Sequence, residues 1–115
     1  MLHEKLEVYK RSIHMAGELR KEAATWPKGM GYLVDQLKRA MSSCVLNLAE
    51  GNGRRHRAER RRFFEIARAS VAEVGACIDL ADAFGLMITA RTMELKGELH
   101  RISRMLWKLA NPATL

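Results

Sequence analysis

The chain has 115 residues, with 20 basic and 13 acidic side chains, a formal net charge of +7 and a pI near 9.9. This length predicts one domain, residues 1–115, with one core, and the basic balance points to a polyanionic partner, usually nucleic acid, unless it only aids solubility. No apolar run approaches the roughly 20 residues of a membrane span, and the start lacks the apolar core of a signal peptide, so we expect a cytoplasmic protein.

Helical periodicity divides the chain into four segments, expected as helices at about 2–25, 30–50, 57–84 and 89–110. They are separated by Trp26-Pro27-Lys28-Gly29, by Gly51-Asn52-Gly53, where we expect the second helix to end, and by the region of Gly85. Within each segment, apolar residues recur at spacings of three and four, and no stretch alternates as a strand would. Four amphipathic helices with short connections predict an all-α fold, an antiparallel up-and-down four-helix bundle.

The last three segments each present one apolar face that we expect to form the core. Cys44 and Cys77 lie on these faces and are interpreted as small buried hydrophobic residues. The expected core positions are Met30, Leu33, Leu37, Met41, Cys44 and Leu48, then Phe63, Ile66, Ala67, Ser70, Val74, Cys77, Ile78 and Ala81, then Ile88, Leu95, Leu99, Ile102, Leu106 and Leu109.

The first segment differs because it carries two apolar stripes. We expect the stripe of Leu2, Leu6, Tyr9, Ile13 and Ala16 to face the core. The second stripe, beside it, consists of Val8, Met15 and Leu19, and the third segment has small residues away from its core face at Ala69, Ala72, Ala76 and Ala83. Extra stripes on two helices favour self-association, although alanines are also simply good surface helix formers.

No arrangement of residues typical of catalysis or metal binding is present. A di-metal bundle site needs inward Glu-x-x-His pairs, which are absent. The four histidines fall outside the expected core stripes, at His3, His14, His56 and His100. Ser70 has Glu73 nearby but no basic partner to activate it. We therefore expect no enzyme, no metal and no cofactor.

The segment from Arg54 to Arg62 concentrates the positive charge. Six arginines against one glutamate, Glu59, give +5 of the chain's +7, at a helix start where the dipole disfavours cations. If the helix starts near Arg57, Arg68 joins the same solvent side. Arginine binds phosphate bidentately, so the expected nucleic-acid contacts are Arg54, Arg55, Arg57, Arg60, Arg61, Arg62 and Arg68.

The expected binding is electrostatic and weakly sequence-specific. No aromatic residue is interleaved with these arginines, so base stacking is not indicated. The alternative is a structural or protein-interaction module whose arginines contact acidic protein partners or neighbouring subunits. Glu50 closes the second helix, where a carboxylate is unfavourable; we predict that it pairs with Arg54, Arg55 or Arg57, or with an arginine of another subunit.

Three stretches give the chain a family resemblance. They are Gln36-Leu37-Lys38-Arg39-Ala40, then Asn47-Leu48-Ala49-Glu50-Gly51, then residues 63–73, which read FFEIARASVAE. In order and spacing they resemble the bacterial four-helix-bundle family encoded in intervening sequences of 23S rRNA genes, to which the accessory variability protein of diversity-generating retroelements is related. Leu48 stands where isoleucine is frequent in the family, and Ala69 where glycine is frequent; both are small changes in packing volume.

The resemblance implies an up-down bundle that assembles as a ring-like homopentamer and has no catalytic activity. In the retroelement relatives a basic pentamer binds nucleic acid and a reverse transcriptase, which makes both possible partners by analogy. It also implies structural roles, in helix-end bonds, interhelix bonds and subunit contacts, for Gln36, Arg39, Asn47, Glu50, Gly51, Ser70 and Glu73.

Overall fold

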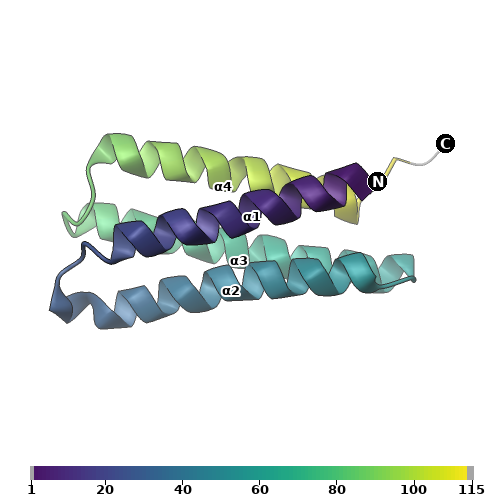
Figure 1. Ribbon diagram of the computed structural model, residues 1–115. Helices are drawn as coiled ribbons and strands as arrows, with labels where there is room; N and C mark the ends of the chain where they lie inside the picture. The colour runs from purple at the N-terminus through teal and green to yellow at the C-terminus, as the bar shows by residue number, and fades with distance from the viewer. Residues whose placement is uncertain (1, 114–115) are drawn as a thin grey trace.

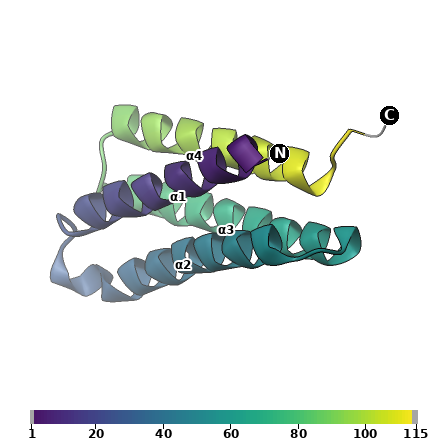
Figure 2. The ribbon, with the colours of Figure 1, turned by 45° about the vertical axis from the view of Figure 1, so that its right-hand side comes forward.

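The structure, a computed structural model, describes residues 2–113 and consists of four long α-helices and one short 3₁₀ helix. This confirms the predicted all-α, four-helix fold. In Figures 1 and 2 consecutive helices run in opposite directions, and the chain turns alternately at the two ends of the bundle. The elements are α1 (Leu2–Ala23), η1 (Lys28–Met30), α2 (Gly31–Gly53), α3 (Arg57–Ala83) and α4 (Thr89–Ala110).

The helix bounds differ from the predicted ones mainly at the end of α2. The fourth helix matches, and the first and third end two residues and one residue early. However, α2 was expected to end at about residue 50, with Gly51-Asn52-Gly53 as the turn, and the helix instead continues through Gly53. Gly51 is buried inside the helix, where a Cβ would lie 2.6 Å from Cε1 of Phe64. Glycine is present there because α2 and α3 approach closely, and not as a helix terminator.

The core runs along the whole bundle and includes most of the positions expected on α2, α3 and α4. Phe64, which was not expected in the core, is fully buried, whereas Met30, Phe63 and Ile66 are only half-buried. Ile88 is 73 % exposed, contrary to expectation, because it precedes α4 and caps it; Thr92 takes the buried position one turn later.

The core face of α1 is the second apolar stripe and not the predicted one beside it. Val8, Met15 and Leu19 are buried, together with Ser12 and Ala23, whereas the stripe expected in the core is exposed and only its last member, Ala16, is half-buried. Ion pairs with α4 accompany this rotation, because Arg11, Glu18 and Glu22 lie on one flank of α1 and pair with Glu98 and Arg91. The exposed side chains are Leu2, Leu6, Tyr9 and Ile13.

The helix α1 is the least tightly packed of the four. It packs against α2 and α4, but less extensively than α3 packs against the same two helices. An apolar groove of about 440 Å³ lies between α1 and α2, lined among others by Ile13, Ala16, Val45 and Leu46. Ser12 is fully buried in α1, and its hydroxyl makes no hydrogen bond within the described residues.

In the turn from α3 to α4, a glycine is required because of its backbone conformation. Gly85 has φ of 75°, and its N–H donates to the carbonyl of Asp82 while the N–H of Leu86 donates to that of Ala81. This pattern satisfies the last carbonyls of α3 and requires a residue that tolerates positive φ. Over residues 2–113, no helix is both long and apolar enough to cross a membrane.

Candidate nucleic-acid interface

The net positive charge of the bundle lies at one of its ends. Residues 2–11, 44–68 and 99–113 form this half, which we call the basic end; the α2–α3 turn and both termini lie there (Figure 1). It holds 13 basic and five acidic side chains, a net of +8, whereas residues 12–43 and 69–98 hold seven basic and eight acidic ones, a net of −1. The fold therefore turns a cluster in the sequence into a polarised molecule about 49 Å long.

Arg54 organises the turn that carries the arginines. Its guanidinium pairs with Glu50 at 2.9 Å and Glu59 at 3.6 Å, and its Cζ lies 5.0 Å from the ring centroid of Phe63. The predicted pairing of Glu50 with an arginine of the turn is thus confirmed. With two carboxylate partners, Arg54 is the most fully paired of the seven predicted contact residues.

Five of the other predicted contact residues have no carboxylate within 4 Å among residues 2–113. Arg57 begins α3, as predicted, and only Arg60 of this group is half-buried. Arg62 lies with its Cζ 5.8 Å from the Phe63 centroid, on the same ring as Arg54. The unpaired side chains are those of Arg55, Arg57, Arg60, Arg61 and Arg62.

Arg68 lies further along α3, where it pairs with Glu65 at 3.6 Å and keeps a third of its side chain exposed. The structure adds basic side chains that the sequence reading did not include. These lie on the neighbouring helices at the same end, where they are scattered along the sequence and form no run: Lys5, Lys10, Arg101, Arg104 and Lys108.

The signature residues of the family resemblance lie mainly along the α2–α3 interface and not at the arginine turn. Gln36 donates a hydrogen bond to Glu73, and Ser70 donates to Ser43 at 2.8 Å. Asn47 donates to the carbonyl of Ser43 at 2.8 Å. Ser43, which the sequence reading did not single out, therefore accepts hydrogen bonds from both Ser70 and Asn47. Arg39 is exposed, and of the signature residues only Asn47, Glu50 and Gly51 lie within the basic end.

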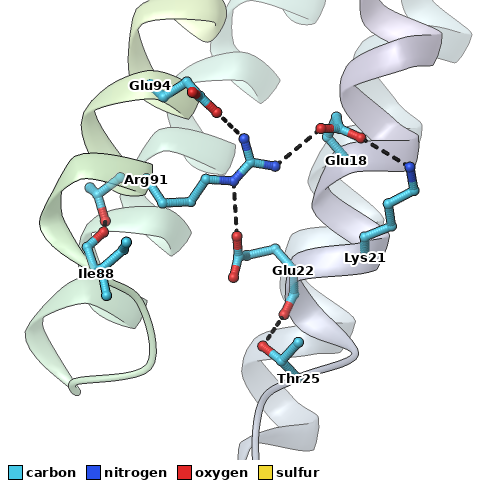
Figure 3. Close-up of polar contacts among 8 residues, drawn as sticks. Glu18, Lys21, Glu22, Thr25, Ile88, Arg91 and Glu94 are labelled. Carbon is cyan, nitrogen blue, oxygen red and sulfur yellow. Dashed lines mark hydrogen bonds and ion pairs between the residues drawn. The ribbon is translucent and has the colours of Figure 1, made fainter.

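The other polar concentration joins α1 to α4 near the opposite end (Figure 3). Arg91 donates to Glu22 at 3.0 Å, to Glu18 at 3.1 Å and to Glu94, and Lys21 also pairs with Glu18. The hydrogen bond from Arg91, followed by that from Lys21, lowers the pKa of the Glu18 carboxyl. Every charged side chain in this cluster has a partner of opposite sign, so the cluster acts as a clamp between the two helices.

The two cysteine thiols are not activated, and the described residues hold no cluster of three potential metal ligands. Burial raises the pKa of the Cys44 thiol to about 11. Burial, and then the Glu73 carboxylate, raise the pKa of Cys77. Between residues 2 and 113, no three His, Cys, Asp or Glu side chains lie close enough together to hold a metal ion.

Comparisons with known proteins agree with this fold. A crystal structure of a protein of unknown function from the S23 ribosomal protein family of Bacteroides thetaiotaomicron VPI-5482 superposes with a TM-score of 0.85 at 15 % identity, covering 93 % of this chain and 97 % of that one. No curated protein matches the chain. The family model described as 23S rRNA-intervening sequence protein matches residues 4–108. The chain therefore belongs to the 23S rRNA-intervening sequence protein family.

Proposed function

We propose that this protein is a non-enzymatic, oligomeric bundle that binds the phosphate backbone of nucleic acid through its basic end, as an accessory to a larger nucleoprotein assembly. The observation that carries the proposal is the segregation of charge, +8 on the basic end against −1 on the other half. Five arginines there have no carboxylate within 4 Å in the described chain. Unpaired arginines on one surface attract polyanions strongly because each phosphate contact releases condensed counterions.

The test is a salt series with matched variants. Arg55, Arg57, Arg61 and Arg62 are changed together to Gln, and binding to RNA and to duplex DNA is measured from low to high salt. The wild type should show a steep negative slope of log affinity against log salt, and the variant a slope smaller by about 3 to 4.

The control variant removes four exposed cations from the other half, by changing Arg20, Lys28, Lys38 and Arg39 to Gln. Both variants have the same net charge, so a general loss of charge would lower their affinities for nucleic acid equally. The proposal requires that the basic-end variant loses far more affinity than the control. Absent or salt-independent binding by the wild type would remove it and leave the alternative, a module whose arginines meet acidic protein surfaces.

Self-association is the second part of the proposal. Leu2, Leu6, Tyr9 and Ile13 form an exposed stripe on α1, and Leu46 of α2, which is 64 % exposed, lies across the apolar groove from Ile13. An exposed apolar surface of this kind is typical of interaction sites. An oligomer, a pentamer by the family analogy, would cover it and also bring several basic ends together.

Light scattering of the double variant Ile13→Lys with Leu46→Lys tests this assembly surface. We expect the wild type to be oligomeric at micromolar concentration and the variant to be a folded monomer, because two buried lysines per interface are costly. Met93→Lys, at a side chain that is 70 % exposed on α4, is the control and should remain oligomeric. A monomeric wild type, or a double variant of unchanged mass, contradicts the assignment of this surface.

A further inference from the structure

Trp107 is a half-exposed indole at the basic end. It lies in the last turns of α4 and is 50 % exposed, whereas Trp26, the other tryptophan of the chain, is 7 % exposed near the opposite end. Lys108 follows Trp107 in the sequence, and Arg104 precedes it by about one helical turn. Both cations are exposed. The sequence reading found no aromatic residue within the arginine segment; the fold brings one to the same end from a helix about 45 residues further along the chain.

The packing of α3 against α4 places Trp107 at the level of Arg68. Lys96 of α4 pairs with Asp79 of α3 at 2.7 Å, which fixes the register of the two helices. Eleven residues, about three helical turns, lead from Lys96 to Trp107, and eleven residues in the opposite direction along α3 lead from Asp79 to Arg68. Because the helices are antiparallel, both steps end at the same height and on the same side.

A shallow groove continues along the α3–α4 seam from this point. It has a volume of about 310 Å³ and is lined by Ala72, Gly75 and Ala76 of α3 and by His100 and Ser103 of α4, among others. Trp107 lies one turn beyond Ser103, and Arg68 lies one turn before Ala72. Side chains four residues apart share a helix face, so Arg68 and Trp107 stand at the basic end of this groove.

We propose that Trp107 is a stacking platform for an unpaired base of single-stranded nucleic acid, whose phosphates lie on Arg61 and Arg68 of α3 and on Arg104 and Lys108 of α4. The inference rests on the proposed nucleic-acid function and names its substrate class. Base faces are accessible in a single strand, whereas in a duplex they are stacked on one another. An aromatic side chain beside a cationic track is the arrangement that single-strand binders use.

Charge argues against a second copy of the chain as the group that covers Trp107. The basic end carries +8, so a second copy that covered Trp107 with its own basic end would press like charges into direct contact. A nucleic acid is attracted by the same charges, and its bases have flat faces that can stack on the exposed indole. The small side chains of the adjoining groove leave room for a neighbouring nucleotide.

Fluorescence tests the contact directly. In Trp26→Phe, Trp107 is the only tryptophan, and this change also removes a buried indole N–H that has no hydrogen-bond partner in the described chain. The variant is titrated with oligo(U) and oligo(dT) of about 12 nucleotides, within the range of site sizes of single-strand binders, and with an abasic strand of equal length. Both base-containing strands should quench the emission of Trp107, and the abasic strand should leave it unchanged.

Affinity separates stacking from charge. Trp107→Ala should bind oligo(U) and oligo(dT) roughly 5- to 150-fold more weakly, the range for losing one stacked base, while its affinity for the abasic strand and its salt slope stay the same. Arg68→Gln should weaken the binding of all three strands. Trp107→Phe, which keeps an aromatic face, should recover most of the affinity.

Each contrary result has its own meaning. If Trp107→Ala binds every strand as the wild type does, this inference fails while the proposed function stands. If the wild type binds no strand at low salt, both fail. If acrylamide does not reach Trp107 in the free oligomer, and Trp107→Ala dissociates it in light scattering, the indole belongs to a subunit interface and the inference is overturned.

Discussion

Replacing Gly51 by alanine should destabilise the protein by about 2 kcal/mol, the middle of the range for overpacking a core. This is the opposite of the usual effect, because alanine in a helix interior is normally favoured over glycine by up to about 1 kcal/mol. At Gly51 the new Cβ would lie 2.6 Å from Cε1 and 2.8 Å from Cδ1 of Phe64. The ring is fully buried, so it yields only by displacing its own neighbours. Urea denaturation measures the loss.

Gly17→Ala is the matched control. Gly17 lies within α1, is exposed, and has no atom within 4 Å of the position of an added Cβ. Its replacement should leave the free energy of unfolding unchanged or raise it by up to about 1 kcal/mol. In a Phe64→Leu background, Gly51→Ala should cost much less, since the atoms it meets are gone. If Gly51→Ala stabilises the protein as Gly17→Ala does, the close approach of α2 and α3 is wrong.

Replacing Arg91 by methionine should cost about 2 kcal/mol of stability, because hydrogen bonds to charged groups contribute roughly 1.5–3 kcal/mol and partial exposure reduces this value. Arg91 is bonded to Glu18, Glu22 and Glu94, and its side chain is 27 % exposed against 18 % for Glu22 and 25 % for Glu18. Methionine keeps much of the packing but leaves three carboxylates without their shared cation. Urea denaturation at neutral pH measures the difference.

Lys96→Met provides the control for Arg91→Met. Lys96 also pairs between helices, with Asp79, but the two side chains are 43 % and 57 % exposed. An exposed pair contributes about 0–1 kcal/mol, so its loss should be small. Equal losses in the two variants would contradict the view that the Arg91 cluster is a clamp that holds α1 against α4.

The same clamp predicts a dependence on pH. The pKa of Glu18 is lowered in the folded protein from its ordinary value of 4.5, first by the hydrogen bond from Arg91 and then by that from Lys21. A carboxyl with a lowered pKa stabilises the fold above its unfolded pKa, and this contribution is lost as the pH falls through the folded value. The stability of the wild type should therefore fall below about pH 4.5, and Arg91→Met should lose less over the same range.

The sequence predicts the fold well because periodicity and breakers act locally. The core faces of α2, α3 and α4 follow from spacings of three and four, and the pairing of Glu50 with an arginine of the turn follows from a carboxylate placed at a helix end. The rotation of α1 was predicted wrongly because that helix has two apolar stripes, and the exposed stripe has more apolar residues than the buried one. Its ion pairs with α4 are contacts across about 70 to 87 positions, which periodicity within one helix does not reveal.

Only part of the candidate site could be predicted from the sequence, for the same reason. A run of arginines is local, so Arg54 to Arg62 was evident, but Trp107, Arg104 and Lys108 join that end only through the antiparallel course of α4. Gly51 was misread because a helix terminator and a close approach both require glycine. Only the position of Phe64 tells the two apart.

The polarised charge has a kinetic consequence. At physiological ionic strength the Debye length is about 8 Å, much shorter than the 49 Å length of the bundle. An approaching polyanion therefore responds to the nearer end alone, and it is drawn in only when that end carries the arginines. For the nucleic-acid binding proposed above, only encounters in which the basic end leads would be productive, so added salt should slow association far more than it speeds dissociation.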